Sequence, residues 1–460
     1  MGVVSLLIDY THGNAIDIIN NLLHPLETEE EESDLSMQAN SEEIIVNNPL
    51  PGVVRKRNTV VDHCYNSESD AEQTMDVASY TNWLIHDESK SALMGIKDMV
   101  FAFQQGWDYL NPLQWLTGYL VMEKYYKAME LNKSLTLIKS GDINQYIRIK
   151  QIHDYAFSAY GWQVINFFQK GQGMLKAAFT KGANEQTIRQ YLKHLEQDEY
   201  ILYNEGDQFI PAHLMIYDKV DNAIVVSIRG TLSLTDSLID FTCEYAPFLN
   251  GFAHKGIVAT AKKLKELLMT EIYHNMVLFQ ANKLILTGHS LGSGIASILL
   301  ILLVQDGFKY DIIAYTFGCP PIVSRNIANQ YDSYIRSFIY RYDLIPRLSY
   351  GTVSDLVTTC ATVMTNSNLM AIFNKKELVD EFDIIYKCKM KYTRKHPQHY
   401  HPKLYIPGVL YYLDDDALYK CNREISEEII LVTPEIYKDH LPGAYDLALS
   451  RLCTEPTEQQ

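Results

Sequence analysis

A glycine–any–serine–any–glycine motif is the part of the sequence whose residue types and spacing most directly predict chemistry. It consists of Gly288, Ser290 and Gly292, with His289 and Leu291 between them. One apolar run precedes the motif and another follows it, so we expect a strand, a sharp turn and a helix. A serine on such a turn presents its hydroxyl above the sheet as a nucleophile for acyl transfer. The glycines allow close approach of the two elements, and the helix N-terminus stabilises a developing oxyanion.

A serine hydroxyl becomes a good nucleophile when a histidine removes its proton and a carboxylate orients that histidine. In folds with this turn, the acid and then the histidine follow the serine along the chain. Asp343 is the expected acid, because it follows the apolar run 335–340 and Pro346 ends strand pairing soon after. His440 is the expected base, because it follows the last expected strand, 429–432.

A second group of histidines also follows the serine: His396, His399 and His401. Their spacing suits a metal site as an alternative. The surrounding segment 392–403 carries three Lys or Arg residues and two prolines, which favours a basic surface loop. The sequence therefore predicts no metal and no cofactor.

Strands and helices must alternate to position these residues, and the sequence shows this alternation after about residue 155. Short, nearly continuous apolar runs are typical of strands buried on both faces. The pattern predicts an α/β fold with a mainly parallel central sheet. The expected strands are 223–228, 283–287, 312–317, 335–340, 409–413 and 429–432, and the expected helices are 254–276, 293–304 and 434–452.

The residues before this region differ in composition. Residues 1–75 contain an acidic run, 27–34, and polar sequence, which predicts a disordered acidic region. Residues 76–149 have a helical character. Within them, the aromatic-rich stretch 107–126 fits either a pair of core helices or a surface that contacts lipid head groups.

The overall composition excludes several classes of protein. The 460 residues include 40 Lys and Arg against 56 Asp and Glu, a net charge of −16, so nucleic acid is not an expected partner. The seven cysteines form no C-x-x-C pair, which indicates neither a zinc framework nor a disulfide scaffold. We find neither a signal peptide nor an apolar run of the roughly 18 residues that a membrane span needs. A cytoplasmic location is expected.

The ordered set of motifs resembles the class 3 lipases, which are α/β-hydrolases, and among them most of all the sn-1-specific diacylglycerol lipases. The resemblance implies that Ser290 is the nucleophile, Asp343 the orienting acid and His440 the general base. It also implies that the backbone N–H of Thr231 binds the oxyanion beside the N–H of Leu291. It covers roughly residues 150–455, and the segments that carry it are 155–162, 225–233 with Asp236 and Asp240, 253–256, 288–292, 343–347 and 439–442.

The resemblance implies hydrolysis of an acyl ester of a glycerolipid, above all the sn-1 ester of diacylglycerol, at a membrane or lipid-droplet surface. The chain departs from the membrane-spanning diacylglycerol lipases in having no spanning segment, so peripheral association is expected. Residues 352–403 form a long insertion, expected to be a flap with a basic head-group contact, or else an inert surface excursion. The alternatives are a triacylglycerol lipase, a phospholipase A1, a soluble carboxylesterase or a catalytically silent lipid-binding protein.

Overall fold

The computed structural model describes residues 138–162, 164–165, 183–196, 199–207, 209–231, 245–356, 402–415, 417–426 and 438–454. The expected acidic region 1–75 and nearly all of the expected helical region 76–149 lie outside these ranges. The described helices include none with the length and apolarity needed to cross a membrane.

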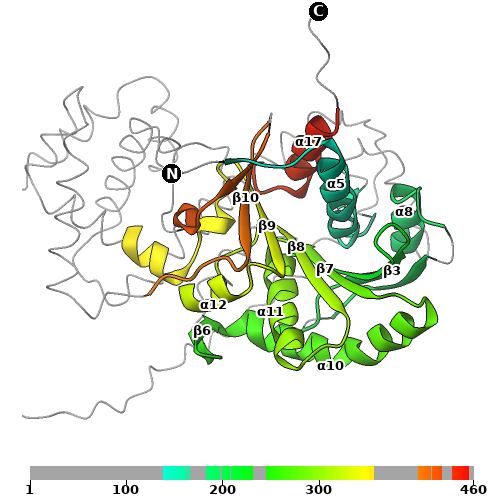
Figure 1. The fold of residues 1–460 in the computed structure, drawn as a ribbon, viewed down its shortest axis with the longest axis horizontal. Coiled ribbons are helices and arrows are strands. Elements are labelled where there is room, and N and C mark those ends of the chain that lie inside the picture. Colours follow the sequence, from blue (N-terminus) through cyan, green and yellow to red (C-terminus); the bar gives the residue numbers. More distant parts are fainter. Residues whose placement is uncertain are drawn as a thin grey trace, which may run out of the picture. The chain divides into compact units, whose positions relative to one another are not determined.

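A nine-stranded sheet forms the centre of the described structure, with the strand order β1-β11-β10-β9-β8-β7-β4-β3-β2 (Figure 1). Its five central strands, from β10 to β4, are parallel to one another. The outer pairs are antiparallel. The strands are β1 (Ile138–Lys139), β2 (Tyr200–Asn204), β3 (His213–Asp218), β4 (Ala223–Ile228), β7 (Lys283–His289), β8 (Asp311–Phe317), β9 (Ile335–Tyr340), β10 (Val409–Leu413) and β11 (Leu418–Cys421).

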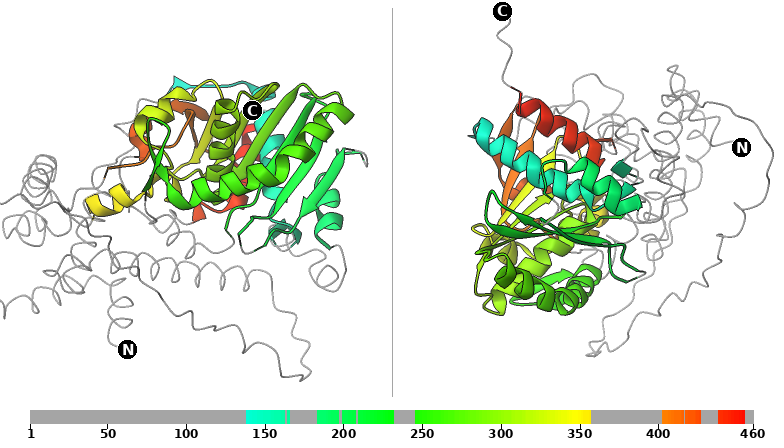
Figure 2. Two further views of the ribbon diagram at one scale, coloured as in Figure 1. Left: turned by 90° about the horizontal axis from the view of Figure 1, so that it is seen from below. Right: turned by 90° about the vertical axis from the view of Figure 1, so that its right-hand side faces the viewer.

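Helices cover both faces of this sheet. Figure 2 shows α5 and α17 side by side on one face and α10 and α11 on the other. A separate hairpin of β5 (Tyr245–Phe248) and β6 (Gly251–His254) leads into α10. The helices are α5 (Ile143–Ser158), α8 (Ala183–Tyr191), α10 (Lys255–Leu278), α11 (Leu291–Gln305), α12 (Arg325–Gln330) and α17 (Pro442–Leu452), with 3-10 turns at Ile345–Arg347 and Arg423–Ser426.

The apolar central strands form the core because each supplies side chains to both faces. In β4, Ile224 and Val226 pack into the cluster beneath α10 and α11, whereas Val225 packs into the cluster beneath α5 and α17. Successive strand residues point to opposite faces, so a strand covered on both sides must be continuously apolar. A mainly parallel sheet with helices on both faces and a serine turn between β7 and α11 is the α/β-hydrolase fold.

Most of the expected elements after residue 155 are confirmed, with three corrections. The expected start of the hydrolase domain at residue 150 lies inside α5, and β1 already belongs to the sheet. The expected helix 434–452 is described only from residue 438, and it is interrupted by a turn at 439–441. Helix α17 begins after this turn at Pro442, because proline lacks an N–H and suits the first helical turn. The sequence reasoning missed the antiparallel strands β1, β2, β3 and β11, as well as the hairpin. The expected strand 429–432 lies outside the described residues.

Candidate active site

The turn between β7 and α11 holds Ser290 in an unusual backbone conformation. Its φ of 56° and ψ of −129° lie outside the regions that ordinary residues prefer. The turn is tight because β7 and α11 both approach the end of β4. A Cβ atom on Gly288 would lie 2.7 Å from the carbonyl oxygen of Ile228, and one on Gly292 only 2.1 Å from it. Both glycines of the motif are therefore required by close packing.

Ser290, His440 and Asp343 form a continuous hydrogen-bonded chain. His440 Nε2 lies 2.8 Å from Ser290 Oγ, and His440 Nδ1 lies 2.9 and 3.0 Å from the two carboxylate oxygens of Asp343. All three side chains are at least 96% buried. Asp343 follows β9 in the short turn before the 3-10 helix Ile345–Arg347, as the sequence predicts. In this arrangement, His440 can accept the serine proton while the carboxylate stabilises the resulting imidazolium.

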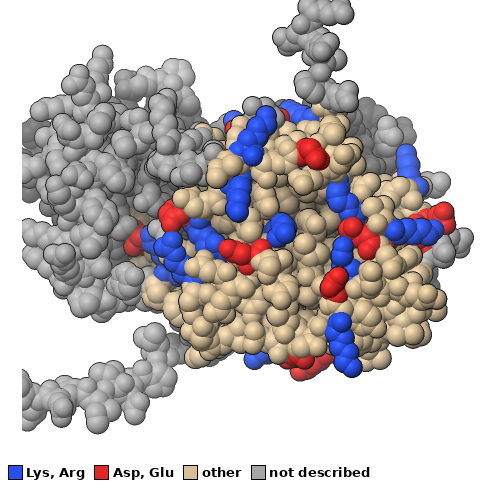
Figure 3. All heavy atoms as spheres, viewed as in Figure 1, with Lys and Arg blue, Asp and Glu red and all other residues tan. Residues whose placement is uncertain are grey.

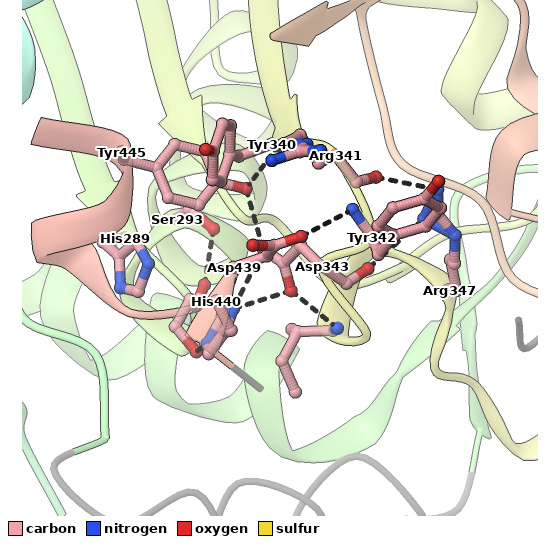
Figure 4. A network of polar contacts seen from close by, with 12 residues as sticks. His289, Ser293, Tyr340, Arg341, Tyr342, Asp343, Arg347, Asp439, His440 and Tyr445 are labelled. Atoms are coloured by element: carbon pink, nitrogen blue, oxygen red, sulfur yellow. Dashed lines mark hydrogen bonds and ion pairs between the residues drawn. The ribbon is translucent and has the colours of Figure 1, made fainter. Parts of the chain in front are cut away.

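Two further donors hold the carboxylate of Asp343. The hydroxyl of Tyr445 donates to Oδ2 at 2.7 Å, and the backbone N–H of Ile345 donates to Oδ1 at 2.9 Å (Figure 4). The oxygen of Tyr445 in turn accepts the backbone N–H of Tyr340, the last residue of β9, at 2.9 Å. The carboxylate is thereby fixed by α17, β9 and its own turn.

A buried arginine also supports the turn that holds Asp343. Arg347 is fully buried and donates to the carbonyl oxygens of Asp343 at 3.3 Å and Arg341 at 3.1 Å. Burial lowers the pKa of its guanidinium from the usual value. On the other side, the backbone N–H of Tyr342 donates to Asp439 at 3.0 Å, which ties the turn to the residue before His440.

The expected oxyanion donors lie at the ends of β4 and β7. The hydroxyl of Thr231 is buried and has no hydrogen-bond partner within the described part of the chain. Leu291 is the first residue of α11, so its N–H lacks an intrahelical acceptor. Residues 232–244, which include Asp236 and Asp240, lie outside the described ranges.

Two histidines near this chain of hydrogen bonds are neutral. Burial, and then the neighbouring His440 and His153, lower the pKa of His289 well below its usual value. Burial likewise lowers the pKa of His153 to about 3. The ring of His289 lies 4.8 Å from that of His440, between centroids. The candidate base therefore lies beside one uncharged imidazole, that of His289.

The described residues contain one group with the geometry of possible metal ligands: His153, Asp154 and Asp446. The ammonium of Lys150 already lies 2.6 Å from Asp154 and 3.0 Å from Asp446. Because a lysine supplies the cation there, this group is an ion-pair cluster. The alternative metal site at His396, His399 and His401 falls outside the described residues.

The insertion 352–403 is described only at its two ends. Residues 357–401, with most of its basic side chains, lie outside the described ranges. At the far end, Lys403 pairs with Asp355 at 3.0 Å. One cation of the expected head-group contact therefore has an internal partner.

Sequence reasoning did not identify Tyr445, Arg347 or Tyr160 as site residues. Tyr160 follows α5, and its hydroxyl lies 2.8 Å from Nδ1 of His289. Tyr445 and Tyr160 reach the site from segments far along the chain, whereas Arg347 lies four residues after Asp343, in the motif 343–347. The ordered motif 155–162 contains Tyr160 but indicates no role for it.

Residues 225–352 match the family model of the class 3 lipases. This segment of the chain is therefore similar to the class 3 lipases. The matched segment holds both Ser290 and Asp343, whereas His440 lies beyond its end.

Two curated proteins to which this chain is similar are diacylglycerol lipases. The chain is 32% identical to diacylglycerol lipase-beta of Mus musculus over 164 residues, which are 34% of this chain and 24% of that protein. It is 34% identical to diacylglycerol lipase-alpha of Homo sapiens over 150 residues, 28% of this chain and 14% of that protein. The matches thus span about a quarter of the length of these relatives or less. Among solved structures, the Rhizomucor miehei triacylglyceride lipase is 13% identical, with a TM-score of 0.44 over 69% of this chain and 100% of that one.

Proposed function

We propose that this chain is a serine hydrolase that cleaves an acyl ester of a glycerolipid, with the sn-1 ester of diacylglycerol as the preferred substrate. The observation that supports it most is the hydrogen-bonded chain through His440, which joins the hydroxyl of Ser290 to the carboxylate of Asp343. The similarity to two diacylglycerol lipases favours diacylglycerol among the glycerolipids. The substrate would be taken from a membrane or lipid-droplet surface.

In the first half of the reaction, the oxygen of Ser290 attacks the ester carbonyl while His440 Nε2 accepts its proton. The carbonyl oxygen becomes an oxyanion, which the backbone N–H groups of Thr231 and Leu291 stabilise. His440 then donates the proton to the leaving glycerol oxygen as the ester bond breaks. The acyl group remains bound to Ser290.

In the second half, water attacks the acyl-enzyme and gives its proton to His440. The second oxyanion collapses, the proton returns to Ser290 and a free fatty acid leaves. Asp343 stays ionised throughout and stabilises the imidazolium that forms in each half.

A lipid panel tests this proposal. Diacylglycerol, triacylglycerol, monoacylglycerol and phospholipid are presented in vesicles, and the products are resolved by position on the glycerol. We expect release of the sn-1 acyl chain of diacylglycerol, and a loss of about 10⁴-fold or more in kcat for Ser290→Ala. Labelling by a fluorophosphonate should likewise depend on Ser290.

The panel also separates the alternatives. Hydrolysis that survives in Ser290→Ala would disprove the proposed nucleophile. Wild-type protein without hydrolysis or labelling would point to a silent lipid-binding protein. A preference for triacylglycerol or phospholipid would keep the mechanism and change the substrate.

A further inference from the structure

The hydroxyl of Tyr160 lies between two segments that meet at the candidate site. It is 2.8 Å from Nδ1 of His289, the residue before Ser290. On its other side it lies against the backbone of Gly230, the residue before Thr231. Tyr160 is 95% buried, so water does not compete for these contacts.

Gly230 is confined by the same neighbours. A Cβ atom at this position would lie 2.5 Å from the oxygen of Tyr160, 2.5 Å from the carbonyl oxygen of His289 and 3.1 Å from Cβ of Ser290. The end of β4 is thus packed directly against both the serine turn and the tyrosine. A small movement of this backbone would also move the N–H of Thr231.

The hydrogen bond between Tyr160 and His289 has a defined direction. Burial keeps His289 neutral, so its Nδ1 can accept the proton of Tyr160. The same tyrosine oxygen fills the space beside Gly230 that a Cβ atom would occupy. Tyr160 therefore bonds the residue before Ser290 and packs against the residue before Thr231.

We propose that Tyr160 is a positioning residue, whose hydroxyl fixes the oxyanion donor Thr231 relative to the nucleophile Ser290. It does so by bonding His289, the residue before Ser290, and by packing against Gly230, the residue before Thr231. This inference rests on the proposed hydrolase function and adds a residue to it. Phenylalanine keeps the ring but removes the hydroxyl, and with it the hydrogen bond to His289 and the contact with Gly230, so the N–H of Thr231 would lose its alignment with the oxyanion. Because the oxyanion exists only after attack, the effect should fall on kcat and not on KM.

The test is the Tyr160→Phe variant, measured on diacylglycerol vesicles. We expect kcat to fall about tenfold, with KM within about twofold of wild type. Fluorophosphonate labelling of Ser290 should become slower by a similar factor but still reach full stoichiometry. Full labelling shows that the variant folds and keeps its nucleophile.

Tyr155→Phe is the matched control. Tyr155 lies in α5, five residues earlier, is also buried, and donates to Asp218 at 2.8 Å, away from the serine turn. The Tyr155→Phe variant therefore loses a buried tyrosine hydroxyl without changing the contacts of His289 or Gly230. We expect a lower melting temperature for this variant and an unchanged kcat.

A double-mutant cycle tests the link through His289. If Tyr160 acts through its hydrogen bond to His289, Tyr160→Phe should cost little further activity once His289→Gln has removed that bond. Independent losses that multiply in the double variant would overturn the inference, as would a wild-type kcat in Tyr160→Phe. Wild-type protein that neither labels nor hydrolyses would instead remove the proposed function, and the inference with it.

Discussion

Ser290 stands at the N-cap of α11 but does not cap the helix. Serine at this position usually accepts a backbone N–H from the first turn. Here the serine makes no such bond, and its hydroxyl lies 2.8 Å from His440 instead. The hydroxyl of Ser293 bonds to the backbone carbonyl of Ser290 and helps to hold the turn. The local structure therefore gives up one capping interaction, and the hydroxyl stays available for the histidine.

His153 is the clearest buried titratable group outside the hydrogen-bonded chain. Its ring stacks between Phe157 and Tyr445, meets Phe317 edge-on and is fully buried. Neither ring nitrogen has a hydrogen-bond partner among the described residues. The ring acts as an aromatic core residue and is held neutral by burial, which lowers its pKa to about 3.

This burial predicts a pH-dependent loss of stability. The unfolded chain binds a proton at His153 near pH 6.5, whereas the folded chain does so only near pH 3. The stability that neutral His153 contributes to the folded chain is therefore complete above pH 6.5 and is lost as the pH falls towards 3. Between pH 7 and pH 5 this one group should cost about 2 kcal/mol of unfolding free energy. Urea unfolding at pH 7 and pH 5 measures this for wild type and His153→Phe. The unfolding free energy of the variant should fall by about 2 kcal/mol less than that of wild type between the two pH values. An equal fall in both proteins would contradict the prediction.

At the scale of elements, the sequence predicts best where one local pattern determines the structure. The mainly apolar runs of β4, β8, β9 and β10 mark strands buried on both faces, and the structure places them within one residue of the expected bounds. The missed strands lack that pattern. Strand β2 is only half-buried, and β3 has just four apolar residues between His213 and Asp218. Their pairing depends on neighbours that no local pattern reveals.

The same distinction applies to the candidate site. Ser290, Asp343 and His440 follow from one short motif and a rule of chain order. Tyr160 lies 129 residues from His289, so only the folded chain shows their contact. The residues that support the candidate site from distant segments are likewise found only from contacts in the folded chain.

Helix α11 offers a comparison of two glycines on one element. A Cβ on Gly292 would lie 2.1 Å from the backbone oxygen of Ile228, which cannot move away without shifting β4. A Cβ on Gly294 would first meet the methyl end of Ile257, at 3.2 Å. Gly292→Ala should lower the unfolding free energy by about 3 kcal/mol, whereas Gly294→Ala should change it by less than about 1 kcal/mol, because helix propensity offsets the contact.

Chemical denaturation with fluorophosphonate labelling measures both effects. Gly292→Ala should also slow the labelling of Ser290, because the serine turn must shift with the helix. If the two variants were equally stable, Gly292 of α11 would not pack closely against the backbone of Ile228 in β4.

At the scale of the whole molecule, the negative charge is unevenly distributed along the chain. Residues 1–75 hold 14 Asp and Glu against three Lys and Arg, a net charge of −11, which leaves −5 for residues 76–460. On the face drawn in Figure 3, the described Lys and Arg side chains are interspersed with Asp and Glu. The hydrolase region is therefore almost balanced, and most of the repulsion from an anionic surface comes from the first 75 residues.

This distribution predicts how hydrolysis responds to surface charge. An anionic bilayer repels acidic side chains near it over about 8 Å at physiological ionic strength. Replacing Glu29–Glu32 by Gln in the full chain removes four of these charges. On diacylglycerol vesicles with anionic lipid, the variant should be roughly threefold faster than wild type at low salt. The difference should vanish at high salt, because screening already removes the repulsion, and should be absent on zwitterionic vesicles. A rate increase that persists on zwitterionic vesicles would mean that these residues act on the enzyme itself and not through the field of the membrane.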